Sequence, residues 1–399
     1  MNKRLLLIMG NGITIDLMNH LGKSSEIDTG NLFRYGSMVP WPGTNKPGFL
    51  SYKYCPNLWH LGARSTISNE DSLSLIEQII QCANVYGAAA FLDHALQRNP
   101  NDIHIKAYHE LLLYLRYLFV HYDKKVGPLS AAQVEKWPWL KIIRDAINQN
   151  VFSQVTVVTY CYDIWLERSL TALGIPFYVS GFESPPATGK AVEILKPHGS
   201  ISFCYKNELP RSAFTEIKLR DFLDHSTTPT DDFTVNYQDL DRVFPLTPLI
   251  PPAGQSRRFG QYLSRDTSIG RDANQPTTEV TNTLVGEEAV SAQEMVSAAV
   301  TTGETSDDAV RQDGWANTIR KTAMERAQDL AEGDELILGG LSYWHVDRDE
   351  IDGLLAASHP QANVKMVNPS APQSLNAVLT SLFPNYIHFS NASVLSEAL

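Results

Sequence analysis

The feature that most constrains this chain is a pair of short apolar segments that both end in polar residues. The first, at 154–167, reads QVTVVTYCYDIWLE, and the second, at 193–203, reads EILKPHGSISF. Short runs rich in Val, Ile and Thr predict buried strands. An open α/β sheet builds its site where parallel strands end in polar and glycine residues. The pair therefore predicts a site at the carboxyl edge of such a sheet.

The rest of the chain alternates between strand and helix patterns. The apolar run 3–9 predicts a buried strand that leads into a glycine turn and a short helix at 13–21, followed by an irregular stretch at 22–67. Strands with turns are expected at 334–347 and 363–371, and helices at 315–333, 349–357 and 374–383, the first of them ending at Gly333. This alternation predicts an α/β fold with a Rossmann-like, mostly parallel sheet.

Two segments interrupt that pattern. Residues 68–150 have helical spacing of apolar residues and begin at Ser68, a helix-capping residue, so they predict an inserted helical module or cap. Residues 261–313 hold ten Asp or Glu against three Arg and one aromatic residue. Such a stretch buries little apolar surface, which predicts a flexible acidic insertion with at most a helix near 286–300. The sheet domain would then comprise 1–67, 151–260 and 314–399.

Composition excludes several classes of protein. The net charge of −11 argues against a nucleic-acid binder, and the longest apolar runs are too short to cross a membrane. The four cysteines form no C-x-x-C pair, which argues against a zinc site and favours a reducing compartment. We therefore expect a cytoplasmic protein that binds no metal, no membrane and no nucleic acid.

The turn Gly10-Asn11-Gly12 follows the first strand and precedes a helix. Its backbone N–H groups are placed to approach a phosphate, although many such turns only connect a strand to a helix. Because position 15 is Ile15, the full G-x-G-x-x-G pattern of dehydrogenases is missing.

His198 stands between a proline and a glycine at the end of the second segment. Imidazole is suited to general-base catalysis near neutral pH, and the alternative is a structural histidine bonded to the backbone. Asp163 is expected either to serve the site or to cap the helix after it. Thr159 has the hydroxyl to bond a ribose or phosphate, and Cys161 is most simply a small buried residue.

Two late turns have the same character. Gly339, Gly340 and Ser342 follow one predicted strand, and Asn368 follows the next. Glycines permit close approach of a nucleotide to the backbone, and the Asn368 amide has the groups to bond an adenine or a ribose.

In chain order these pieces resemble the sirtuin-like NAD-binding fold, in the branch that serves bacterial anti-phage defence. The resemblance runs through MGNG (9–12), VVTYCYDIWLE (157–167), ILKPHGSISF (194–203), PLIPPAG (248–254), LILGGLSYWHVD (336–347) and VNPS (367–370). It omits the helical module and the acidic insertion. The GNG opening also looks like that of abortive-infection proteins related to this fold.

The resemblance implies that NAD binds as substrate and that its nicotinamide–ribose bond is cleaved. It implies that His198 is the catalytic base, that Asp163 and Cys161 lie beside the reacting ribose, and that NAD contacts come from Gly10, Asn11, Gly12, Thr159, Gly199, Ser200, Gly339, Ser342 and Asn368. It also implies control by self-assembly into a homo-oligomer or by a second defence protein.

Cys161 departs from the family, which usually has Asn there to order the ribose and the attacking water. A thiol cannot reproduce both functions of an amide. The alternatives are a slow enzyme, an enzyme that uses another Asn such as Asn11, or a catalytically weak or inactive nucleotide sensor or scaffold. Transfer of ADP-ribose to a protein is a more distant alternative. Deacylation is not expected, because the four-cysteine zinc module of the deacetylases is missing.

Overall fold

The computed structural model describes residues 3–40, 46–90, 103–149, 151–187, 189–206, 230–240 and 315–398. The acidic insertion at 261–313, its expected helix near 286–300 and the PLIPPAG segment lie outside the described residues.

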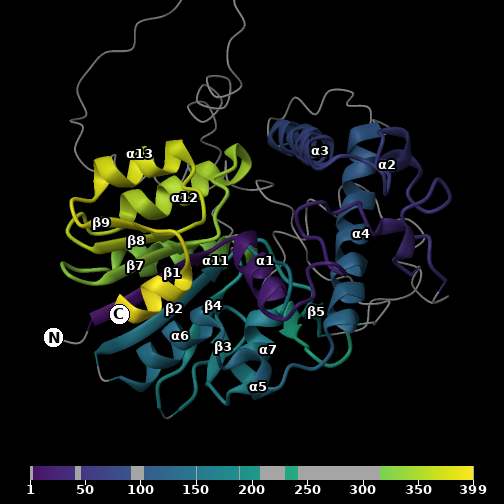
Figure 1. Ribbon diagram of the computed structural model, residues 1–399. Coiled ribbons are helices and arrows are strands. Elements are labelled where there is room, and N and C mark those ends of the chain that lie inside the picture. The colour runs from purple at the N-terminus through teal and green to yellow at the C-terminus, as the bar shows by residue number, and fades with distance from the viewer. Residues whose placement is uncertain are drawn as a thin grey trace, which may run out of the picture.

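The core of the protein is a sheet of seven strands in the order β3-β4-β2-β1-β7-β8-β9, and every neighbouring pair is parallel. Its strands are β1 (Lys3–Met9), β2 (Phe152–Thr159), β3 (Phe177–Val179), β4 (Val192–Leu195), β7 (Glu335–Gly339), β8 (Asn363–Val367) and β9 (Tyr386–Phe389). Helices flank this sheet (Figure 1), which confirms the predicted α/β, Rossmann-like class. A separate two-stranded ribbon pairs β5 (Phe203–Tyr205) with β6 (Phe233–Val235).

The strand order reverses direction at β1. From β1 the chain moves outward through β2 to β3 and β4, and it later returns to place β7 on the other side of β1. In open α/β sheets, ligands bind beyond the carboxyl ends of the strands at such a switch point. The turns that follow β1 and β7 are therefore the expected place for a site.

The helices of the first half are α1 (Asn11–His20), η1 (Gly36–Met38), α2 (Pro56–His60), α3 (Asn69–Ala90), α4 (Ile103–Val126), α5 (Ala131–Val134), α6 (Pro138–Asn148) and α7 (Trp165–Ala172). Ser68 caps α3 as its sequence predicted, since its hydroxyl accepts the backbone N–H of Asp71 at 3.0 Å. Helices α2, α3 and α4 pack together beside the sheet (Figure 1), whereas α6 packs on β2 and on α14.

The later helices are η3 (Thr230–Asp232), α11 (Trp315–Gln328), α12 (His345–Ala357), α13 (Gln373–Leu382) and α14 (Ala392–Ala398). α11 packs on β4 and α12. It ends at Gln328 rather than at Gly333, which instead has a left-handed φ of 78° in the turn before β7. In the described part of the chain, no helix is both long and apolar enough to cross a membrane.

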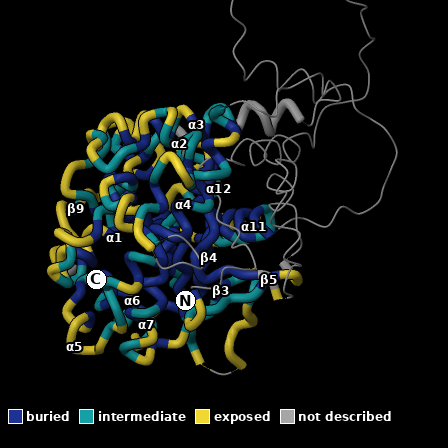
Figure 2. Tube along the Cα trace, turned by 90° about the vertical axis from the view of Figure 1, so that its right-hand side faces the viewer, coloured by how far each residue is buried: buried dark blue, intermediate teal, exposed yellow. Residues whose placement is uncertain are grey.

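Burial follows the strands that lie in the middle of the sheet. Leu5–Met9 of β1 are all buried, as are Val192–Leu195 of β4, and Figure 2 shows the dark, buried tube running through the centre. The edge strand β9 is different, because Ile387 is 54% exposed. That mixed pattern explains why the sequence did not predict β9.

The glycine turns after β1 and β7 touch through their backbones. The N–H of Gly10 donates to the carbonyl of Gly339, and that of Gly12 to the carbonyl of Gly340, both at 2.9 Å. A Cβ at Gly12 would lie 2.5 Å from Cα of Gly340. Gly340 itself has a φ of +61°, a left-handed conformation that favours glycine.

We predict that Gly340→Ala destabilises the protein far more than Gly22→Ala. Both positions have left-handed φ, but a Cβ at Gly340 would lie 2.5 Å from the backbone nitrogen of Ile13, whereas no atom lies within 4 Å of one at Gly22. Strain alone costs about 1 kcal/mol, and overpacking adds roughly 1–3 kcal/mol. Urea denaturation measures both losses, and equal losses would contradict the importance of the backbone contact.

Candidate functional site

Parallel pairing brings three chain segments to one edge of the sheet. Met9, the last residue of β1, pairs with Thr159 at the end of β2 and with Gly339 at the end of β7. The GNG turn, the segment 159–163 and the Gly339–Gly340 turn consequently start side by side. The segment 196–200 follows β4, the next strand beyond β2.

A small pocket lies between the ends of β1 and β2. It has room for about one water molecule. Its lining combines apolar and ionisable side chains: Met9, Ile13, Thr14, Leu17, Trp137, Thr159, Cys161, Asp163, Trp165, Leu166, Glu167 and Lys196. Three of the predicted site residues, Thr159, Cys161 and Asp163, therefore share one pocket.

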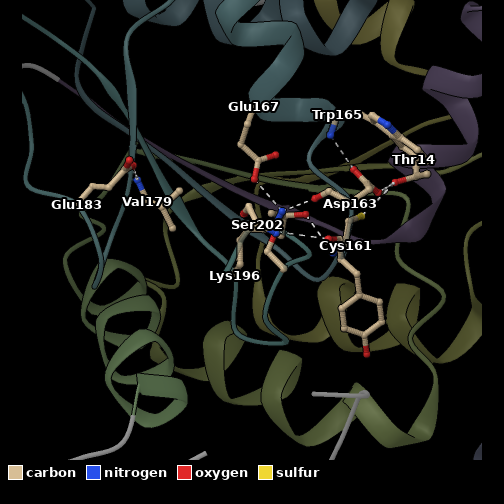
Figure 3. A network of polar contacts seen from close by, with 12 residues as sticks. Thr14, Cys161, Asp163, Trp165, Glu167, Val179, Glu183, Lys196 and Ser202 are labelled. Carbon is tan, nitrogen blue, oxygen red and sulfur yellow. Dashed lines mark hydrogen bonds and ion pairs between the residues drawn. The ribbon is translucent and has the colours of Figure 1, made fainter. Parts of the chain in front are cut away.

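A buried ion pair joins the two segments from which the sequence analysis predicted the site, 154–167 and 193–203. Nζ of Lys196 lies 2.8 Å from Oε1 of Glu167, and each side chain is only 1% exposed. The same ammonium donates to the backbone carbonyl of Asp163 (Figure 3). Burial raises the pKa of Glu167, against the opposing attraction of Lys196. The pair fixes the turn after β2 to the end of β4.

Asp163 has the capping role that was one of its two expected functions. Its Oδ1 accepts the backbone N–H of Trp165 at 3.1 Å, at the start of α7. Its Oδ2 accepts the hydroxyl of Thr14 at 2.6 Å, which ties the turn to α1 (Figure 3). With both oxygens engaged, this carboxylate acts as a fixed part of the pocket wall.

Cys161 is held by short-range contacts on both sides. Its Sγ lies 3.4 Å from the carbonyl oxygen of Gly10 and 3.4 Å from the hydroxyl of Thr14, and its N–H donates to the hydroxyl of Thr159 at 3.2 Å. Burial, reinforced by the charge of Asp163, raises the pKa of the Cys161 thiol to about 12. The sulfur is therefore a neutral thiol at physiological pH and no activated nucleophile.

His198 belongs to a second polar cluster, beside the pocket. Its side chain is 1% exposed, and its ring centroid lies 4.7 Å from that of Tyr160, the residue before Cys161. Nε2 lies 3.8 Å from Oδ1 of Asp347 and 3.8 Å from Oε2 of Glu350. Both carboxylates come from α12, the helix after β7. The two clusters thus meet along the segment 160–163.

The charges of this second cluster are unequal. Nε of Arg320 lies 3.0 Å from Oε2 of Glu350, and both side chains are almost fully buried. Burial alone would raise the pKa of Glu350, but Arg320 and His198 outweigh it and lower the pKa to about 2. Burial raises the pKa of Asp347 to about 6, despite the opposing effect of His198. Glu350 is therefore expected to be ionised at neutral pH, whereas the pKa of Asp347 lies closer to neutral.

Several residues that were predicted to contact NAD already form hydrogen bonds within the protein. The Asn11 amide donates to the carbonyl of Thr29 at 2.9 Å, and the Asn368 amide donates to that of Leu341 at 2.9 Å. Ser200 shares a hydrogen bond of 2.9 Å with Ser202. Gly199 has a φ of 83°, and Ser342 is exposed. Of these positions, Ser342 presents a side chain to solvent at the switch point.

The sequence analysis assigned no site role to one hydroxyl and five charged side chains of the two clusters. They are Thr14, and Glu167, Lys196, Arg320, Asp347 and Glu350. For Lys196 and Glu167 a signal was present, since both lie inside the two site segments. Arg320 and Glu350 gave none, because charged residues on amphipathic helices usually face solvent.

Comparison with known proteins identifies no family. A scan against protein-family models finds no match, and a search of curated proteins finds none either. Within the described residues, no group of three or more His, Cys, Asp and Glu side chains is arranged to hold a metal ion.

We predict that Lys196→Met lowers the free energy of unfolding by about 3–5 kcal/mol, because it leaves Glu167 as an uncompensated buried charge. The double variant Lys196→Met/Glu167→Leu removes both charges and should lose much less than the sum of the single losses. Urea denaturation of the wild type, Lys196→Met, Glu167→Leu and the double variant gives the coupling energy between the two side chains.

The pair Lys23–Glu26, 3.5 Å apart and with side chains 33% and 48% exposed, is the matched control. Lys23→Met should change stability by less than about 0.5 kcal/mol. Additive losses at Lys196 and Glu167 would mean that the buried pair is not coupled.

Proposed function

We propose that this protein is a glycohydrolase that cleaves NAD, or a closely related nucleotide, into nicotinamide and ADP-ribose, with His198 as general base. The observation that carries the proposal is the position of His198. Its imidazole lies among carboxylates at the sheet edge where the turns after β1, β2 and β7 come together. The sirtuin-like resemblance of the same segments supports NAD as the substrate.

The reaction requires few groups from the protein. The bond between C1′ of the ribose and the nicotinamide nitrogen breaks, and nicotinamide leaves with the bonding electron pair. Water then attacks the oxocarbenium-like ribose, and His198 accepts the proton that this water loses. A positioned general base of this kind contributes roughly 10²–10⁴-fold to the rate.

The rest of the nucleotide is expected to contact the glycine-rich turns after β1 and β7. The phosphates are expected over these turns, but the N–H groups of Gly10 and Gly12 already donate to the carbonyls of Gly339 and Gly340, so other groups of these turns would have to bind them. His198 is 1% exposed, and the pocket next to it has room for about one water molecule. Access of NAD therefore requires the segments around His198 to separate, which provides a point of control.

Uncontrolled NAD hydrolysis is toxic, so we further propose that the activity is switched on by self-assembly or by a partner protein. In this role the enzyme would deplete NAD during phage infection, as the family resemblance implies. Helices α3 and α4 of the helical module (residues 68–150), which pack together beside the sheet, offer a surface for that control (Figure 1).

We predict that His198→Ala reduces nicotinamide release from NAD by roughly 10²–10⁴-fold. Release is measured with purified full-length protein, alone and with lysate of infected cells. His60→Ala is the matched control, since His60 is exposed on α2 and contacts the ring of Tyr52. Undiminished release by His198→Ala would remove His198 from the mechanism.

A nucleotide-binding sensor or scaffold is the second candidate, and Cys161 favours it. The neutral thiol contacts the Gly10 carbonyl and the Thr14 hydroxyl, where the family's Asn would offer an amide to the ribose and water. A sensor of this type would bind NAD or ADP-ribose at the same glycine turns without cleaving it.

We predict that Cys161→Asn raises the rate of nicotinamide release by about 10-fold, because one well-placed polar group is worth roughly 10²–10³ at full effect. Residue 161 lines the pocket, so an amide at this position would face the same space as the thiol. Cys161→Ala removes the thiol without adding an amide, and it should show no gain. If wild-type release is at background and the Asn variant gains 100-fold or more, the native protein is a sensor rather than an enzyme.

A further inference from the structure

His198 and Asp347 face each other at the sheet edge with buried polar atoms that have no hydrogen-bond partner. No described residue lies within hydrogen-bonding distance of Oδ1 of Asp347, and the same holds for both ring nitrogens of His198. Oδ1 and Nε2 are 3.8 Å apart, which is less than 1 Å beyond a normal hydrogen bond. Leaving buried polar atoms without partners is costly, so a small movement that closes this gap satisfies both.

Glu350 lies at the same distance from Nε2, 3.8 Å, and His198 helps to lower its pKa, but this carboxylate has a second partner. Its Oε2, the atom that faces His198, already accepts from Arg320 at 3.0 Å. The Glu350–Arg320 pair therefore forms a fixed, neutral wall on one side of the imidazole. Asp347 is left as the carboxylate whose charge is not balanced by a neighbouring arginine at contact distance.

We propose that Asp347 is the positioning residue of His198: its carboxylate accepts the Nε2 proton, orients the ring and leaves Nδ1 as the basic atom. The catalytic role of Asp347 in this inference rests on the proposed function, whereas the pairing of Asp347 with His198 does not depend on it. The tautomer of a histidine is set by the hydrogen bond that its other nitrogen makes. Catalytic hydrogen bonds are often long in the free enzyme and tighten when substrate binds.

Charge balance supports the assignment. The charged and titratable groups that face His198 come from the segment after β2, from α12 and, through Glu350, from α11: Tyr160, Tyr162, Asp347, Glu350 and Arg320. With Glu350 and Arg320 cancelling, an ionised Asp347 leaves one negative charge. An imidazole that takes up a proton from the attacking water neutralises that charge.

Keeping this carboxylate ionised has a cost that the fold bears at neutral pH. Burial raises the pKa of Asp347 to about 6 from an ordinary value near 3.8, so the folded protein binds the proton more tightly than the unfolded chain. The protonated Asp347 carboxyl therefore stabilises the folded state. This stabilisation is complete below about pH 4 and is lost as the pH rises through about 6.

The test is Asp347→Asn beside a matched control, Asp349→Asn, which lies two residues further along α12 and has an exposed side chain. We expect Asp347→Asn to lower kcat for nicotinamide release by 10–100-fold with KM changed less than threefold, a range usual for partners of site residues. The same variant should melt roughly 2–4 °C higher than wild type at pH 8, and the two should converge near pH 4. Asp349→Asn should match wild type in both measurements.

A spectroscopic arm separates this inference from the proposed function. In ¹⁵N-labelled protein at pH 8, the His198 ring, identified by the signals lost in His198→Asn, should carry its proton on Nε2 in wild type and show a mixture of tautomers in Asp347→Asn. Unchanged kcat, a lower melting temperature or an unchanged tautomer would overturn the role of Asp347. No nicotinamide release by wild type, with the tautomer change present, would overturn the hydrolase and leave the pairing intact.

Discussion

The close backbone contact between the turns after β1 and β7 is the constraint on which the site depends. Gly12 and Gly340 approach so closely that neither tolerates a side chain, and the two hydrogen bonds between these turns lock the switch point of the sheet. Every candidate residue is placed relative to that contact: Cys161 through the Gly10 carbonyl, Asp163 through Thr14 on α1, and His198 through α12, which follows the second turn. The primary role of these glycines is therefore structural. Any contribution to phosphate binding uses geometry that the fold already requires.

Charge in the interior is organised into pairs that each span two distant segments. Lys196 and Glu167 join the ends of β4 and β2, whereas Arg320 and Glu350 join α11 to α12. A third pair, Arg326 with Glu193, fastens α11 to β4 at 2.6 Å. Buried pairs are weak contributors to net stability, but each strongly penalises the loss of one partner. They therefore favour a single arrangement of the strand-end segments, and Asp347 stands out because it lacks such a close cationic partner in the described residues.

Much of the fold could be predicted from the sequence, and less of the site. Continuous apolar runs gave β1, β2 and β4 because strands buried on both faces have no polar alternation to obscure them. The half-exposed β9 carried no such pattern. At the site, Thr159, Cys161 and Asp163 do share a pocket, as their common strand end suggested, but His198 lies in the neighbouring cluster with Asp347 and Glu350. That juxtaposition depends on how α12 packs across the sheet, which local sequence does not encode. The side chains of Asn11, Asn368 and Ser200 likewise have local partners that no motif revealed.

The Lys196–Glu167 pair has a consequence for how this sequence can vary. Replacing either residue alone leaves an unpaired charge in the interior. A lineage that loses the pair must therefore pass through an unstable intermediate or change both positions nearly at once. Among descendants of this chain, positions 167 and 196 should accordingly co-vary, retained as a pair or replaced as a pair. The segment from Thr159 to Glu167 and the segment from Lys196 to Ser200 then behave as one inherited unit, although 28 residues separate Glu167 from Lys196 in the printed sequence.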